Sequence, residues 1–171
     1  MPLLGETGCR LAEIVGLRLT DIDLENDLIY IRPNSARRLK NKTSERALPL
    51  VGYAKLAVEQ ALSQYDDEWL FPQYIKSGHC YATHASNAFN KWLKRDFGGL
   101  TAHSLRHTFR DRLRAVECPI DMIDQIGGWR CAGGVATNYG HGYSRLQVER
   151  WLRLVLIPLA SGNGTYTLDP F

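Results

Sequence analysis

The chain contains 171 residues, of which 44% are hydrophobic and 23% are charged. This length suits one compact domain and is too short for two domains of ordinary size. The net charge of +3 is too mild to indicate a polyanionic partner unless the basic residues are clustered. The sequence has no apolar run of the roughly 18 residues needed to cross a bilayer and no secretory signal pattern, so we expect a cytoplasmic protein without a membrane partner. The four cysteines form no CxxC pair, which excludes the usual zinc and disulfide patterns.

The first third of the chain predicts a helix and a small sheet. Apolar residues between positions 11 and 15 share one helical face. Residues 28–31 (LIYI) are β-branched and aromatic and stand between turn residues, which predicts a strand. Two further segments, 37–40 and 46–50, flank the polar residues 41–44. We therefore expect a β-hairpin with a basic tip there.

The remainder of the chain is expected to be mostly helical. Apolar residues recur at helical spacing in five segments: 54–62, 89–93, 101–116, 120–126 and 148–156. In the fourth segment Ile120, Ile123 and Ile126 are expected to point inward. The predicted fold class is mainly α with a small antiparallel β-sheet (α+β). We expect one domain over residues 1–158 and a flexible tail over residues 159–171, which are small, polar and glycine-containing.

Several basic residues occur beside glycine-rich turns and a late tyrosine. A single arginine on a helix is usually a solvated surface group, so only the joint placement of such residues is informative. Five motifs follow one another along the chain: TGCRLAEIVGL with Arg10 and Glu13, KTSERALPL with Lys42, HSLRHTF with His103, Arg106 and His107, IGGW with Trp129, and YGH with Tyr139 and His141.

In this order, the five motifs closely resemble those of the catalytic domain of the tyrosine recombinase, or phage integrase, family. The resemblance covers the chain to about residue 158, and HSLRHTF is its most specific part. It implies the fold of that catalytic domain and site-specific DNA recombination through a 3′-phosphotyrosyl intermediate, without a metal or any other cofactor. Members of the family usually carry an N-terminal helical domain that completes a clamp around the duplex. Because the first motif begins at Thr7, we expect an excised catalytic fragment that lacks this domain.

The chemistry of the residues agrees with the resemblance. Cutting a phosphodiester without a metal requires cations at two non-bridging oxygens, an in-line nucleophile and a proton for the leaving oxygen. Arg10 and Arg106 present planar, permanently charged forks that match phosphate oxygens. The other roles follow the family pattern: Tyr139 as nucleophile, Lys42 as general acid to the 5′ oxygen, His103 as proton acceptor and Trp129 as indole donor to the phosphate.

Two assignments have rivals in the sequence. Tyr143 is the alternative to Tyr139, because the spacing from Trp129 is one residue longer than in common family members. Lys40 is the alternative to Lys42. We expect supporting roles rather than direct catalysis for three residues: Glu13, His107 and His141.

Two basic segments are expected to line one groove for double-stranded DNA. The predicted DNA contacts are Arg37, Arg38, Lys40, Arg46 and Arg110.

We expect a monomer for the isolated fragment and a tetramer on DNA during synapsis. The helix around Trp151 is expected to pack on its own chain, with a neighbouring subunit as the alternative. Two other functions remain open at this point: a DNA-binding regulatory module without turnover, and DNA relaxation of the type IB topoisomerase kind.

Overall fold

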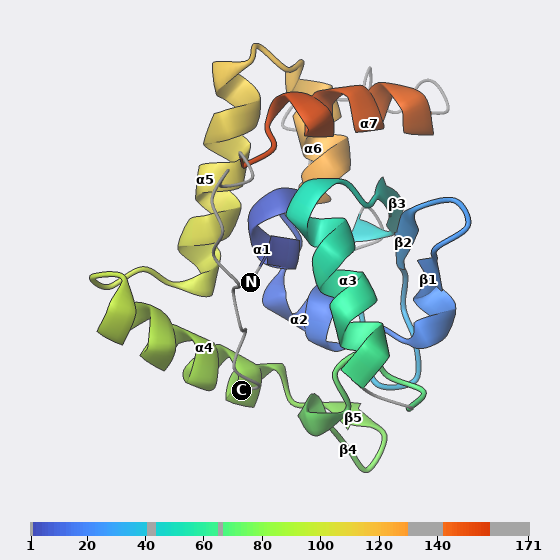
Figure 1. Ribbon diagram of the computed structural model, residues 1–171, viewed down its shortest axis with the longest axis vertical. Coiled ribbons are helices and arrows are strands. Elements are labelled where there is room, and N and C mark those ends of the chain that lie inside the picture. Colours follow the sequence, from blue (N-terminus) through green and yellow to red (C-terminus); the bar gives the residue numbers. More distant parts are fainter. Residues whose placement is uncertain (1, 41–43, 65–66, 130–141, 158–171) are drawn as a thin grey trace.

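The computed structural model describes residues 2–40, 44–64, 67–129 and 142–157. A small antiparallel sheet lies at one edge of a mainly helical body, and α5 runs along the opposite side beside α1 (Figure 1). The helices are α1 (Pro2–Thr7), α2 (Leu11–Val15), α3 (Gly52–Gln64), α4 (Ala82–Asp96), α5 (Ala102–Ala115), α6 (Ile120–Gly127) and α7 (Arg145–Leu154), with 3-10 turns η1 (Leu19–Asp21) and η3 (Pro72–Tyr74). This architecture confirms the predicted mainly α fold with small antiparallel sheets.

The larger sheet has the strand order β1 (Ile22–Asp23), β2 (Leu28–Ile31) and β3 (Arg46–Pro49). Both pairs are antiparallel, and in the second pair Ile29 lies opposite Leu48. A separate two-stranded ribbon consists of β4 (Ile75–Lys76) and β5 (His79–Cys80). The strand predicted at residues 28–31 is confirmed.

The predicted hairpin between residues 37–40 and 46–50 is wrong. The second segment does form β3, but β3 pairs with β2 instead. The first segment leaves the sheet because Arg37 closes a turn with Asn34, whose side-chain oxygen accepts a hydrogen bond from the Arg37 backbone N–H at 2.9 Å. The sequence showed basic residues on both sides of a polar turn but not which strand would be the partner.

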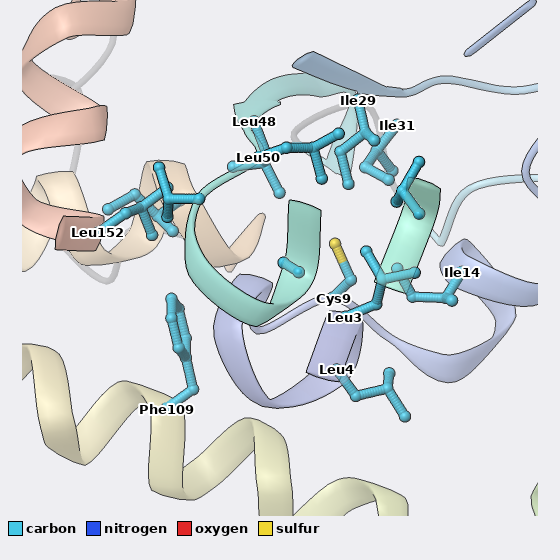
Figure 2. Close-up of a cluster of buried hydrophobic side chains, with 14 of the residues drawn as sticks. Leu3, Leu4, Cys9, Ile14, Ile29, Ile31, Leu48, Leu50, Phe109 and Leu152 are labelled. Carbon is cyan, nitrogen blue, oxygen red and sulfur yellow. The ribbon is translucent and has the colours of Figure 1, made fainter. Parts of the chain in front are cut away.

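Sheet and helices share one apolar core. Figure 2 shows its central residues: Leu3, Leu4, Cys9 and Ile14 near the N-terminus, Ile29, Ile31, Leu48 and Leu50 around the sheet, and Phe109 and Leu152 from α5 and α7. Gly8 lies against the Phe109 ring with a φ of +61°, where a Cβ would come within 2.4 Å of the ring carbon Cδ1. Only glycine suits both this backbone conformation and this close approach. The contact fixes the start of the first motif against α5.

The predicted helices are present, with one error in their inward faces. Ile123 and Ile126 are buried, whereas Ile120 is 70% exposed. Each three-residue step on an α-helix turns the side chain by about 60° away from its starting face, so Ile120 cannot share the buried face with Ile126. In α7, Val148 and Leu152 are buried and the helix contacts β3 of the same chain, as predicted for self-packing.

No helix within the described ranges combines the length and the apolar character that a membrane span requires. The predicted domain limits at residue 158 stay a prediction, and the predicted tail over residues 159–171 lies outside the described residues.

A buried carboxylate joins the two ends of the described chain. Glu6 is 3% exposed, and its Oε2 accepts a hydrogen bond from the backbone N–H of Ala54 at 2.8 Å, in the first turn of α3. Its Oε1 accepts one from the N–H of Ile157 at 3.3 Å. A carboxylate at a helix N-terminus also interacts favourably with the helix dipole.

We expect the Glu6→Ala substitution to lower the free energy of unfolding by about 1–3 kcal/mol, because two backbone donors lose their acceptor. Urea unfolding followed by circular dichroism measures this loss. Glu59→Ala, at an exposed position of the same helix α3, is the matched control and should stay within about 0.5 kcal/mol of the parent chain. Equal losses in the two variants would show that the Glu6 contacts do not stabilise the fold.

Candidate active site

Arg10 stands immediately before α2, and Glu13 holds it there. The Glu13 carboxylate accepts hydrogen bonds from the Arg10 backbone N–H at 2.8 Å and from Nη1 at 2.6 Å. Nη1 also donates to the Ser44 hydroxyl at 3.1 Å. The Arg10 side chain nevertheless remains 28% exposed, so its guanidinium is oriented by the protein and accessible to a ligand.

Arg106 reaches the same region from the middle of α5. It is 4% exposed, and its guanidinium donates to the carbonyl of Gly8 and, at 2.7 Å, to that of Gly127. Burial and the nearby charge of Arg10 lower the pKa of Arg106 to about 10. The group therefore stays protonated at neutral pH.

The C-terminal end of α6 brings the two arginines together. Arg106 binds the Gly127 carbonyl, and Nη2 of Arg10 donates to the next carbonyl, that of Gly128, at 3.3 Å. Gly128 ends the helix in the left-handed region with a φ of +60°, a common helix C-terminal conformation that glycine adopts without strain. The carbonyl end of a helix carries partial negative charge, which favours nearby guanidinium groups.

Trp129 covers this helix end. Its ring centroid lies 4.2 Å from the guanidinium carbon of Arg106 and 5.0 Å from that of Arg110, within the range of cation–π attraction. A Cβ on Gly127 would lie 1.7 Å from the ring carbon Cζ3. The glycine in the IGGW motif is thus required by the position of the indole.

Arg46 binds the same Glu13 carboxylate as Arg10. Its side chain is 5% exposed and that of Glu13 is 4% exposed, with Nη2 of Arg46 at 3.0 Å from Oε2 of Glu13. Burial alone would raise the pKa of Glu13, but the charge of Arg46 and the hydrogen bonds from Arg46 and Arg10 outweigh it and hold the pKa below its ordinary value. The buried carboxylate is therefore ionised.

His103 lies on α5, one turn before Arg106, and its ring packs edge-on against His107 with 4.5 Å between the ring centroids. Partial burial, followed by the charges of His107, Arg106, Arg10 and Lys40, lowers the pKa of His103 below its ordinary value. A neutral imidazole at physiological pH is able to accept a proton. Arg106 follows His103 by one turn of α5 and meets Arg10 at the carbonyl end of α6, so residues predicted from separate motifs gather in one region.

Three predicted residues, Lys42, Tyr139 and His141, lie outside the described residues, so their roles stay predictions. The alternatives to Lys42 and Tyr139, which are Lys40 and Tyr143, lie within the described residues. Lys40 is exposed. The hydroxyl of Tyr143 donates to a carboxylate oxygen of Asp121 at 2.7 Å, and this hydrogen bond, together with some burial, raises the pKa of Tyr143. Asp121 thus engages the Tyr143 hydroxyl in this structure, and the choice between Tyr139 and Tyr143 stays a prediction.

The predicted DNA contacts separate into buried and accessible side chains. Arg37 is 4% exposed and donates to the backbone carbonyls of Glu13 and Arg32. Arg46 is buried as described above. In this structure the donors of Arg37 and Arg46 bind groups inside the protein, and contacts of these two residues with DNA stay a prediction. Three predicted contacts remain accessible: Arg38 and Lys40 are exposed, and Arg110, 28% exposed, pairs with Asp124.

Sequence reasoning missed the groups that hold the two arginines. The acceptors are the Ser44 hydroxyl and the backbone carbonyls of Gly8, Gly127 and Gly128. Their only signal in the sequence was the presence of glycine in the TG and GGW parts of the motifs. Every residue has a backbone carbonyl, so residue types do not show which carbonyls accept hydrogen bonds from the arginines. The folded chain shows this.

The chain as a whole is similar to known proteins. The model of the phage integrase family matches residues 1–145. The chain belongs to the phage integrase family. One curated relative, tyrosine recombinase XerD of Brucella abortus (strain 2308), is 28% identical over 136 residues, which cover 71% of this chain and 40% of the relative. The chain therefore spans less than half the length of this integrase-family relative.

Solved structures of two integrase-family members share the fold. The Tn1549 transposon integrase in complex with transposon right end DNA has a TM-score of 0.59 and 21% sequence identity, covering 86% of this chain and 55% of that one. XerA recombinase has a TM-score of 0.57 and 22% identity, covering 89% of this chain and 55% of that one. These likenesses confirm the predicted catalytic-domain fold of the tyrosine recombinases.

Proposed function

We propose that the chain is the catalytic domain of a site-specific DNA recombinase that cuts and rejoins double-stranded DNA. The observation that carries this proposal is the convergence of Arg10 and Arg106, which come from distant segments and bind consecutive carbonyls at one helix end. Two guanidinium groups held in this way suit the two non-bridging oxygens of a single phosphodiester. The integrase that shares the fold was solved with transposon DNA, which supports DNA as the substrate.

The proposed reaction exchanges one phosphodiester for another. The phenol oxygen of Tyr139 attacks phosphorus, the bond from phosphorus to the 5′ oxygen breaks, and a 3′-phosphotyrosyl link forms. His103 accepts the phenol proton, and Lys42, or Lys40 in its place, protonates the leaving 5′ oxygen. One phosphoester bond replaces another at each step, so religation to a second strand needs no ATP.

Accessible basic side chains would hold the duplex beside this site. We assign phosphate contacts to Arg38, Lys40 and Arg110, which makes binding tolerant of sequence and sensitive to salt. Assembly of four copies on DNA during synapsis and a cytoplasmic, DNA-associated location belong to the same proposal, as does an N-terminal domain that closes around the duplex.

A suicide substrate with a randomised target sequence tests the reaction. The chain is mixed with a pool of duplexes that carry a nick within the randomised part, so that cleavage beside the nick releases a short fragment and traps the covalent complex. Protein-linked DNA is recovered by phenol extraction and sequenced. We expect adducts with a preferred sequence that form equally well in the presence of EDTA.

Other outcomes distinguish the two alternative functions. Binding of duplex DNA without any adduct would indicate a regulatory module that has the fold but no turnover. Relaxation of supercoiled plasmid without sequence preference would indicate a type IB topoisomerase activity. Loss of the adducts in EDTA would contradict metal-free cleavage.

A further inference from the structure

The buried Glu13 carboxylate opposes the positive charge that Arg10 needs in the proposed reaction. The carboxylate contacts Nη1 of Arg10 at 2.6 Å, and an ion pair this short largely cancels the positive charge that Arg10 would offer to a phosphate. Arg10 is oriented by Glu13 but also neutralised by it. A second cation on the same carboxylate would remove this conflict.

Arg46 is that cation. Its Nη2 lies 3.0 Å from Oε2 of Glu13, while Arg10 occupies Oε1. Two guanidinium groups then share one carboxylate, which leaves one positive charge in excess. Arg46 is nearly fully buried and Arg10 is partly exposed, so a ligand can reach the excess charge only through Arg10.

The remaining donors of Arg46 bind neutral groups. Nε donates to the carbonyl of Ile126 at 2.7 Å, Nη1 to the carbonyl of Ser44 at 2.6 Å, and Nη2 also to the thiol of Cys9 at 3.2 Å. Burial raises the pKa of Cys9 despite the nearby charge of Arg46, so the thiol is neutral and cancels no charge. Glu13 is the one carboxylate to which Arg46 donates among the bonds of the described residues.

These bonds also connect the segments that carry the site. Cys9 and Glu13 flank Arg10, and Ser44 comes two residues after Lys42 in the sequence. Ile126 precedes the two carbonyls that bind Arg10 and Arg106. Arg46 therefore contacts each of these segments, at residues 9–13, 44 and 126.

We propose that Arg46 is a positioning residue that neutralises Glu13, so that Arg10 keeps its orientation and still presents a positive charge to an anionic phosphate group. This inference rests on the proposed function for its substrate, but the anion site that it describes is testable separately. Arg46 itself does not touch the DNA.

Four variants separate charge from packing. Arg46→Gln leaves Glu13 to neutralise Arg10, and we expect adduct formation on the suicide substrate to slow by about 10- to 100-fold, the range typical of residues that orient a ligand side chain. Arg46→Lys keeps the charge without the fork and should stay within about fivefold of the parent chain. In the double variant Glu13→Gln/Arg46→Gln the opposing charge is removed too, and the rate should recover several-fold over Arg46→Gln.

The fourth variant, Arg112→Gln, is the matched control for losing a partly buried guanidinium. Arg112 donates to the carbonyl of Gly5 and lies over the Phe109 ring, away from Glu13. Thermal unfolding of every variant identifies any that fail to fold. If Arg46→Gln is unfolded, the test rests on Arg46→Lys alone. An Arg46→Lys chain that is folded but forms adducts as slowly as the unfolded Arg46→Gln chain would overturn the inference.

A second readout does not depend on cleavage. Inorganic phosphate is titrated into the protein while the indole N–H signal of Trp129, which stacks on Arg106, is followed by NMR and identified with a Trp129→Phe chain. We expect the affinity for phosphate to fall in Arg46→Gln and to return in the double variant. A double variant no better than Arg46→Gln, or a parent chain that binds no phosphate, overturns the inference. If phosphate binds as expected but no adduct forms, only the proposed function fails.

Discussion

Replacing Tyr139 with phenylalanine is expected to abolish the covalent protein–DNA complex. The substitution removes one oxygen atom, the proposed nucleophile, and no neighbouring group would form the same ester with the 3′ phosphate. Loss of a nucleophile of this kind lowers catalysis by about 10⁴-fold or more. The measurement is adduct formation on the nicked duplex pool, together with duplex affinity by fluorescence anisotropy, which should change by less than about threefold.

Tyr143→Phe is the control for this experiment, because it removes the same atom from a nearby tyrosine. The Tyr143 hydroxyl is engaged by Asp121, which raises the pKa of the phenol, and Tyr143→Phe should therefore retain the adduct. If the adduct survives in Tyr139→Phe and disappears in Tyr143→Phe, the two assignments must be exchanged.

The second large effect is expected at Arg106. Arg106→Lys keeps a positive charge but cannot reach the carbonyls of Gly8 and Gly127 with two separate donors while facing a phosphate. We expect adduct formation to slow by about 100-fold or more, which is the scale for removing one donor to the charge that develops in a transition state. Single-turnover cleavage at saturating protein gives this rate directly.

Arg110→Gln is the matched control, because Arg110 also lies over the Trp129 ring but pairs with Asp124 rather than with the glycine carbonyls. We expect Arg110→Gln to bind duplex DNA more weakly and to regain affinity at low salt. The rate of adduct formation in the bound complex should stay nearly unchanged. Equal losses of rate in the two variants would mean that stacking on Trp129, and not the carbonyl contacts, makes Arg106 important.

Local patterns in the sequence predicted the elements that depend on their own residues. The apolar spacing over residues 101–116 predicted a helix, and α5 buries Phe109 and Leu113 of this stripe. This signal is short-range, and the helix is confirmed. The six residues of α1 were not predicted as a helix, because a segment this short has too few turns for its periodicity to be recognised.

The candidate site was predictable as a set of residues but not as a set of contacts. Motif order was sufficient to predict that Arg10 and Arg106 would meet. The sequence could not separate Arg46 from Arg38, because both are basic residues of one segment and only the folded chain buries the first against Glu13. Charge is visible in a sequence, whereas desolvation is a property of the packed structure.

The carboxylate of Glu6 gives the fold a mechanical property. It receives hydrogen bonds from the start of α3 and from Ile157, which follows the end of α7 by three residues. Tension applied to the polypeptide after Ile157, for example by a neighbouring molecule that captures it, would reach the first turn of α3 through the Glu6 side chain and through Leu156, which lies against Gly52. A fluorescent label near Ala54 would then report on traction at the opposite end of the sequence.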